Sequence, residues 1–137
     1  YLAGTTSTSI TEANIDNNSR FIGSDAFYGC SGLTSIRIPD SVTSIGGQAF
    51  SGCSGLTSIT IPNSVKTIGG SAFSGCTWLD KVYYCGTAED WNKISIDDNG
   101  NNDNLTSATR YYYSETQPTE SGNFWHYNKN GEIEEWQ

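Results

Sequence analysis

The stretch Ile45-Gly46-Gly47-Gln48-Ala49-Phe50 occurs three times, with small changes, in this chain of 137 residues. The other copies are Ile22-Gly23-Ser24-Asp25-Ala26-Phe27 and Ile68-Gly69-Gly70-Ser71-Ala72-Phe73, which gives the sequence a 23-residue period. A fixed period of this length predicts a stack of repeats, in which each unit buries its apolar face against its neighbours. Phe27, Phe50 and Phe73 should then lie in a single file.

One repeat reads as a short strand, a second extended segment and a tight return. The apolar positions of the best copy are, in order, Leu56, Ile59, Ile61, Val65, Ile68, Ala72, Phe73 and Cys76. The two isoleucines that alternate about Thr60 are typical of a strand, which Pro62 should end. Gly69-Gly70 is expected to turn the chain after the second segment. The alanine and phenylalanine that follow are predicted to lie on one helical turn.

The repeat pattern divides the chain into two parts. Residues 1–113 are predicted to form the repeat domain, with a degenerate N-terminal coil at 1–21, regular coils at 22–85 and a C-terminal cap at 86–113. In the cap, Trp91 takes the place of Ile68, residues 97–104 form a polar loop and residues 105–113 form a last strand. Residues 114–137 are predicted to be a linker and a type I′ hairpin around Asn130-Gly131, packed on the cap.

Two longer patterns carry a family resemblance. The pattern L-x-x-I-x-I-P-x-S-V-x-x-I-G-x-x-A-F-x-G-C, at residues 33–53 and 56–76, resembles the BspA-type bacterial leucine-rich repeats. Val82-Tyr83-Tyr84-x-Gly86-Thr87-x-Glu89-Asp90-Trp91 is similar to the segment that closes such arrays, so the resemblance covers about residues 21–113. It implies a mainly β fold, a short right-handed leucine-rich-repeat solenoid of 23-residue coils with one helical turn per coil, capped C-terminally and followed by the hairpin.

The same resemblance implies a role outside the cell. Members of the family are associated with adhesion to host matrix proteins and with binding between cells, on secreted or surface-anchored bacterial proteins. The resemblance therefore implies an extracellular or cell-surface location. The expected partner is a host or bacterial surface protein, with matrix proteins and mucins as candidates, and a glycan is a further candidate.

Charge and motifs argue against several other classes of function. The net charge is −8 and no basic cluster occurs, so neither nucleic acid nor an anionic membrane surface is an expected partner. No stretch approaches the roughly 18 apolar residues of a membrane span. No signal peptide is visible in the sequence, which does not begin with Met. His126 is the only histidine and no nucleophile motif accompanies it, so no enzyme, catalytic residue or cofactor is predicted.

The cysteines and the acidic loop are the candidate metal ligands of the chain. Cys30, Cys53 and Cys76 recur with the repeat and should be buried thiols, while Cys85 should lie outside the strand ladder. No Cys-x-x-Cys pair is present, so zinc is not expected. Asp97-x-Asn99-x-Asn101-x-Asp103 alternates oxygen ligands as a calcium loop does, but Ala108 stands where the bidentate Glu of such a loop belongs. A solvated loop is favoured, and calcium binding stays open.

The strand residues between the apolar ones form the first candidate ligand site. By the resemblance they face the concave side of the array: Thr34, Ser35, Arg37, Thr57, Ser58, Thr60, Asp80, Lys81 and Tyr83. Small hydroxyls dominate this set, and the candidates for ligand contact are Arg37, Thr60, Lys81 and Tyr83. Arginine and tyrosine are favoured in binding hot spots. The alternative is a plain solvated strand face.

Aromatic residues near the C-terminus form the second candidate site. Eleven of the 17 aromatic residues lie from Trp78 onward. These rings either cover the open end of the core or offer a platform for a carbohydrate or peptide, with Trp125, Tyr127 and Trp136 as the candidates. Three functions therefore remain: a protein-binding or adhesion module, a structural spacer of a larger surface protein, and a carbohydrate-binding module.

Overall fold

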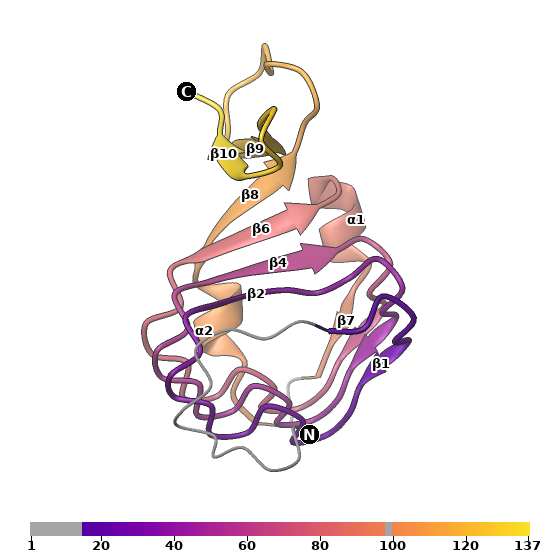
Figure 1. Cartoon of the computed structure of the whole chain (residues 1–137), viewed down its shortest axis with the longest axis vertical. Coiled ribbons are helices and arrows are strands. Elements are labelled where there is room, and N and C mark those ends of the chain that lie inside the picture. Colours follow the sequence, from indigo (N-terminus) through magenta and orange to yellow (C-terminus); the bar gives the residue numbers. More distant parts are fainter. Residues whose placement is uncertain (1–14, 98–99) are drawn as a thin grey trace.

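The computed structural model describes residues 15–97 and 100–137. Most of the predicted degenerate coil, and residues 98–99 of the predicted acidic loop, lie outside the described residues. The fold is mainly β, and the colours of Figure 1 run along the chain from β1 to β10. In chain order they are β1 (Phe21–Ile22), β2 (Ser35–Arg37), β3 (Ser44–Ile45), β4 (Ser58–Pro62), β5 (Thr67–Ile68), β6 (Lys81–Cys85), α1 (Ala88–Asn92), β7 (Ser95–Ile96), α2 (Asp103–Thr106), β8 (Thr109–Tyr113), β9 (Phe124–Tyr127) and β10 (Ile133–Glu135).

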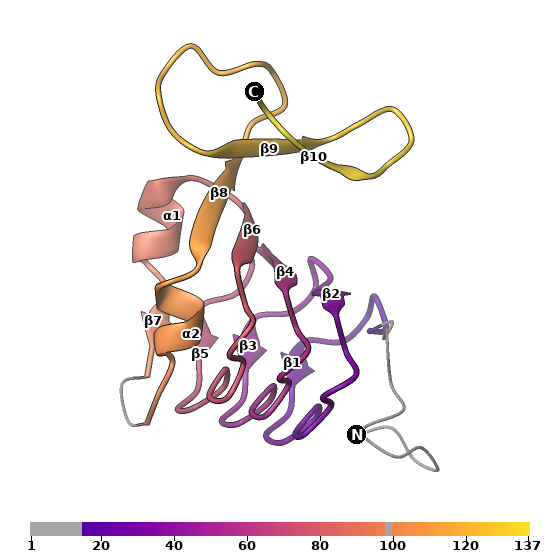
Figure 2. The ribbon, with the colours of Figure 1, turned by 90° about the vertical axis from the view of Figure 1, so that its left-hand side faces the viewer.

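The strands form two sheets on opposite sides of the repeats. One sheet has the order β1-β3-β5-β7 and the other β10-β9-β8-β6-β4-β2. Figure 2 shows the first row of strands below the second. Neighbouring strands of the repeats are parallel, and Ile36 pairs with Ile59, which pairs with Val82. Each pair joins residues at equivalent positions of successive repeats, because every repeat forms its strand from the same part of the repeat sequence.

Identical side chains fill the space between the two sheets. The rings of Phe27 and Phe50 are stacked with centroids 5.2 Å apart, and Phe50 stacks on Phe73 at the same distance. The expected single file of phenylalanines is therefore present. Beside it, the Cys53 thiol donates to the Phe27 carbonyl and the Cys76 thiol to the Phe50 carbonyl. The contact with Cys76 and burial both raise the pKa of the Cys53 thiol, so that it stays neutral.

Two local expectations about the repeat are corrected by the structure. The predicted helical turn at Ala72-Phe73 is a series of hydrogen-bonded turns, because the residue before the alanine has left-handed φ in every copy: 61° at Asp25, 58° at Gln48 and 57° at Ser71. Gly69 is needed for close approach rather than for turning. A Cβ there would lie 2.4 Å from the backbone nitrogen of Gly47 in the preceding repeat.

The parallel strand pairing continues through the cap, but the paired residues lie further apart in the sequence than in the repeats. Ile68 pairs with Ile96 and Tyr83 pairs with Tyr111, both beyond the positions that the repeat period would reach. The additional residues correspond in number to those of helix α1. The sequence predicted that Trp91 takes the place of Ile68, and this prediction is wrong, because Ile96 pairs with Ile68. Trp91 lies buried on α1, edge-on to the ring of Tyr84 at 5.2 Å.

A side-chain amide closes the last regular repeat. In the repeats, the backbone N–H of Phe50 donates to the carbonyl of Ala72 in the next repeat. At the end of the array, the N–H of Phe73 donates instead to Oδ1 of buried Asn102, while Nδ2 of Asn102 donates to the carbonyl of Gly69. One amide thus replaces part of the backbone of a following repeat. The predicted polar loop and last strand are shortened here, because residues 103–106 form α2.

The C-terminal hairpin extends the six-stranded sheet. β9 pairs in parallel with β8, and β10 pairs with β9 antiparallel. The turn is not the predicted two-residue type I′ turn. Asn128 donates its N–H to the Glu132 carbonyl, which leaves a three-residue loop whose last member, Gly131, has a φ of 77°. In addition, Cys85 lies within the β4–β6 ladder opposite Pro62, not outside it as expected.

Candidate functional site

Two rows of side chains run across the face of the six-stranded sheet that points away from the core. The parallel register aligns Ser35, Ser58, Lys81 and Thr109 in one row, and Arg37, Thr60, Tyr83 and Tyr111 in the other. We refer to these eight residues as the strand face. All four strand residues predicted from the sequence lie on it, because strand alternation places every second residue on the same side.

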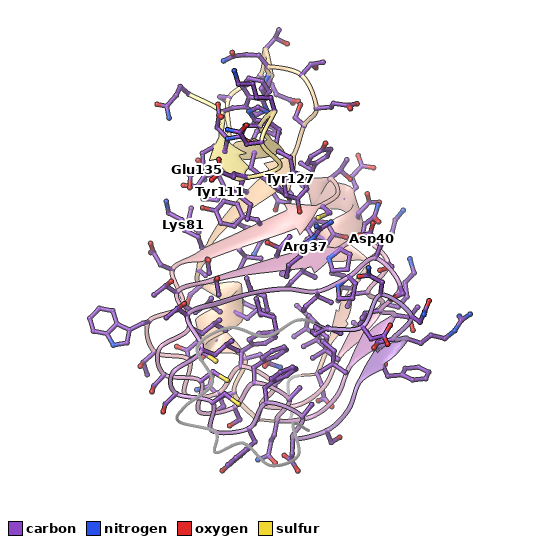
Figure 3. All side chains as sticks on the ribbon, viewed as in Figure 1. Arg37, Asp40, Lys81, Tyr111, Tyr127 and Glu135 are labelled. Atoms are coloured by element: carbon purple, nitrogen blue, oxygen red, sulfur yellow. The ribbon has the colours of Figure 1, made fainter. Side chains whose placement is uncertain are left out.

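The hairpin reaches over one end of the strand face. The Glu135 carboxylate accepts a hydrogen bond from the Lys81 ammonium and another from the Tyr83 hydroxyl, both at 2.7 Å. The Tyr83 ring also stacks on Tyr111 at 5.3 Å and meets the edge of Trp125 at 5.7 Å. These contacts leave Tyr83 only 7% exposed. In Figure 3, Lys81, Tyr111 and Glu135 lie together beside the hairpin.

The second contact between hairpin and strand face involves Arg37. Its guanidinium carbon lies 5.2 Å from the ring centroid of Tyr127, in cation–π geometry. Between this contact and Tyr83, Thr60 is 3% exposed, so it is not available on the surface in this arrangement. The strand residues and part of the aromatic set, which the sequence treated as separate candidate sites, therefore form one cluster. We call Arg37, Lys81, Tyr111, Tyr127 and Glu135 the strand-face cluster (Figure 3).

The ionisation states of Glu135, Lys81 and Tyr83 favour the hydrogen bonds that hold the hairpin on the strand face. Hydrogen bonds from Lys81 and Tyr83 lower the pKa of the Glu135 carboxyl, and the bond to Glu135 raises the pKa of the Lys81 ammonium. Burial, followed by the bond to Glu135, raises the pKa of Tyr83. At neutral pH the carboxylate is therefore ionised and accepts from one cation and one protonated hydroxyl.

The remaining aromatic candidates anchor the hairpin. Trp125 is fully buried, and its indole N–H donates to the Tyr84 carbonyl at 2.8 Å. Trp136 stacks on His126 at 3.8 Å and donates its indole N–H to the Ser114 carbonyl. Of the three predicted platform residues, only Tyr127 and Trp136 keep part of their surface accessible. Ligand binding by these residues stays a prediction.

The acidic loop gives no further support to a metal site. Residues 98–99 of the predicted calcium loop lie outside the described residues, and Oδ1 of Asn101 accepts from the backbone N–H of Asp103. Among residues 15–97 and 100–137, no group of three or more His, Cys, Asp or Glu side chains is placed to hold a metal ion. In the same residues, no helix has the length and apolar character needed to cross a bilayer.

Sequence reasoning missed Glu135 and Tyr111 as members of the site. Tyr111 aligns with Tyr83 only because of the longer spacing in the cap, and counting in steps of the repeat period does not place it there. Glu135 lies 54 residues from Lys81, and no repeat relates the two. The available signal was chemical: a hairpin with several glutamates and aromatic residues follows a face that carries Arg37 and Lys81.

Comparisons with known proteins found a family model and two solved structures that resemble this chain. A family model described as the BspA type leucine rich repeat region matches residues 5–109 with six copies. The crystal structure of a leucine-rich cell surface protein from Faecalibacterium prausnitzii A2-165 is similar, with 38% sequence identity and a TM-score of 0.64, over 66% of this chain and 24% of that chain. A leucine-rich repeat protein from Bacteroides ovatus ATCC 8483 shows 27% identity and a TM-score of 0.44, over 69% and 28%.

This chain thus spans about a quarter of the length of these two solved structures. No curated protein matches it. The family model covers residues 5–109, and the comparisons leave the role of the strand-face cluster to be argued from the contacts described above.

Proposed function

This chain belongs to the BspA-type leucine-rich repeat family, and on that premise we propose that it is a non-enzymatic protein-binding and adhesion module of a bacterial surface or secreted protein. The family supports a protein-interaction or structural role, and the similar protein from Faecalibacterium is named a cell surface protein. In its finer form the proposed fold is a short right-handed solenoid of 23-residue coils. The 23-residue offset of the strand pairs supports it.

The strand-face cluster is the observation that carries this proposal. It gathers two cations, two tyrosines and a carboxylate from β2, β6, β8 and the hairpin on one side of the sheet. Arginine and tyrosine are the side chains that most often dominate binding energy at protein interfaces. Arg37 remains exposed at the edge of this cluster, next to exposed Ser35. The proposed partner, a host or bacterial surface protein such as a matrix protein or mucin, would contact Arg37 and the adjacent hairpin.

The test is a binding measurement on the purified chain against immobilised matrix proteins, mucins and bacterial cells. Arg37→Ala should weaken binding by about tenfold or more, since truncating a hot-spot residue costs about 2 kcal/mol or more and a tenfold change in Kd corresponds to about 1.4 kcal/mol. Lys66→Ala is the matched control, because Lys66 is exposed and precedes β5 in the other sheet. Absence of binding to all these surfaces, or equal loss in both variants, would contradict the proposal.

The second candidate is a structural spacer within a larger surface protein. It is favoured by one observation: Lys81 and Tyr83 are already engaged by Glu135 of the same chain. Alanine at Arg37, Lys81 and Tyr83 in the parent protein distinguishes the two functions. Unchanged partner binding supports the spacer, and loss of binding supports the adhesion module.

A carbohydrate-binding module on the hairpin is the third candidate, and it has less support. Two of its three rings, Tyr127 and Trp136, remain partly accessible, but Trp125 is enclosed by protein. Tryptophan fluorescence that does not respond to a panel of cell-wall and mucin glycans would eliminate it.

A further inference from the structure

A cleft of about 730 Å³ lies between α1, β8 and the loop that leads into β9. Figure 2 shows α1 and this loop on the same side of β8. The volume is within the range of roughly 300–1,000 Å³ that small-molecule sites occupy. The cleft shares no lining residue with the strand-face cluster, so whatever it binds is independent of the adhesion surface proposed above.

Two aromatic rings contribute the apolar part of the cleft: Tyr112 and Phe124. Tyr112 and Phe124 face each other in the β8–β9 register, whereas strand alternation points the Tyr113 ring to the opposite face of the sheet, against Trp125 at 5.2 Å. The side chains of Tyr112 and Phe124 are only partly buried, so part of each ring is open to a ligand. Rings that are fixed by their neighbours offer contact area at little cost in conformational entropy.

A glycine keeps the cleft open beside Phe124. Gly122 has a φ of +142°, which L side chains rarely adopt, and a Cβ at this position would lie 3.0 Å from the Phe124 ring. A side chain at residue 122 would therefore press on the ring that lines the cleft.

Polar groups of both signs surround the rings. The Arg110 guanidinium is fixed by stacking 4.5 Å from the Trp91 ring centroid and by a hydrogen bond from Nε to the Tyr112 hydroxyl. Across the cleft, Glu89 on α1 and Glu120 in the loop are exposed. These three side chains carry a net charge of −1, from two carboxylates and one guanidinium. The cleft thus presents acceptors and donors next to ring faces.

We propose that this cleft binds a neutral sugar of mono- or disaccharide size. A pyranose has one apolar face, which can stack on an aromatic ring, and a rim of hydroxyls, which can donate to carboxylates and accept from a guanidinium. The net negative charge disfavours an acidic sugar or a phosphate. An apolar peptide side chain would cover the rings but leave the carboxylates and Arg110 without new partners.

The test uses the full 137-residue chain and backbone amide NMR. Cellobiose, maltose, lactose, N,N′-diacetylchitobiose, glucuronic acid and a short aromatic peptide are each titrated to about 20 mM, which detects Kd values near ~1 mM. At least one neutral disaccharide is expected to shift the amides of residues 110–114 and 120–124. The double variant E89Q/E120Q and, separately, Gly122→Ala should each weaken this binding by tenfold or more. The matched controls, Glu115→Gln and Tyr28→Ala, are exposed residues outside the cleft and should leave Kd within twofold.

Several results would overturn the proposal. These are no shift with any neutral sugar, tighter binding of glucuronic acid, or binding of the peptide alone. Shifts confined to Tyr127 and Trp136 would instead assign sugar binding to the hairpin platform. Unchanged sugar affinity in both cleft variants would also overturn it. A failure of adhesion to matrix proteins or mucins leaves these measurements unaffected, so the two proposals fail separately.

Discussion

The regular repeats and the C-terminal hairpin are held in place in different ways. In the repeats each contact recurs one unit later, as in the stacking of Phe27 on Phe50 and of Phe50 on Phe73. The hairpin depends on contacts that occur once, such as the bond from the Trp125 indole to the Tyr84 carbonyl. Repetition therefore lets one sequence pattern specify many contacts, whereas the position of the hairpin depends on a few individual side chains.

The largest expected effect comes from breaking the file of phenylalanines. Phe50→Ala should lower the free energy of unfolding by about 3–5 kcal/mol, because it leaves a cavity between the rings of Phe27 and Phe73. Urea denaturation measures this loss. Phe21→Ala, at a side chain that is 66% exposed, is the control and should cost less than about 0.5 kcal/mol. Equal effects would show that the ring stack does not stabilise the repeats.

The next largest effect is expected at the closing amide. Asn102→Ala leaves the buried Phe73 N–H without an acceptor, which costs about 1–3 kcal/mol. It also removes the Nδ2 bonds to the Gly69 and Asp97 carbonyls, for about 1 kcal/mol more, although the Gly69 carbonyl keeps the Ala72 N–H as a donor. We expect a total loss of about 2–4 kcal/mol in the same assay. Asn104→Ala should cost less, since its side chain donates one bond of 3.3 Å to the Phe73 carbonyl. The reverse order would contradict the role assigned to Asn102.

A smaller effect on global stability is expected when the hairpin loses its anchor. Trp125→Ala should release β9 and β10 while the repeats stay folded, at a cost of about 1–2 kcal/mol in global unfolding. Hydrogen exchange measures the two regions separately. The amides of β9 and β10 should lose protection, and those of β4 should keep it. If β4 loses protection to the same extent, the hairpin and the repeats form one cooperative unit.

The smallest effect concerns pH and the contact of Glu135 with Lys81. The pKa of Glu135 is lowered by folding, so its contribution is present above its unfolded pKa of about 4.3 and is lost as pH falls through the lower folded value. The pKa of Lys81 is raised, so its contribution is present below about 10.4 and is lost as pH rises through the higher folded value. Attachment of the hairpin should therefore be strongest between about pH 5 and 10.

Two variants check this pH dependence through hydrogen exchange of the hairpin. Glu135→Gln should weaken attachment of the hairpin by about 0.5–1 kcal/mol at pH 7, as expected for a partly exposed ion pair. It should also reduce the loss of hairpin protection that the unmodified chain shows as the pH falls below about 5. Glu115→Gln, at an exposed carboxylate, is the control. If both variants lose hairpin protection equally as the pH falls below about 5, a group other than Glu135 controls the attachment.

The sequence predicted the parts of the molecule that repetition specifies. The strand at residues 35–37, its partner at 58–60 in the next unit and the buried cysteines follow directly from the period. The longer spacing in the cap was also open to prediction, because Thr87-x-x-Asp90 is a capping-box pattern, and the structure contains both of its hydrogen bonds. The capping box therefore marks the start of α1 in the sequence, although counting in steps of 23 residues does not predict this helix.

The candidate site was predictable only in part. Arg37, Lys81 and Tyr83 could be assigned to one face from strand alternation alone. Their contacts with Tyr127 and Glu135 could not, because these require the direction in which the hairpin leaves β8. That direction depends on the parallel pairing of Tyr113 with Trp125 and on the burial of the Trp125 ring, for which the sequence offers no earlier copy.

The closing amide of Asn102 has a consequence for how arrays of this kind change in length. It recognises backbone groups of Phe73 and Gly69 whose counterparts occur in the two units described before it, at Phe50 and Gly46 and at Phe27 and Gly23. A gene duplication or deletion that adds or removes one whole unit therefore leaves the same backbone groups next to the Asn102 side chain. Evolution can lengthen or shorten such a protein by recombination between copies without redesigning its end.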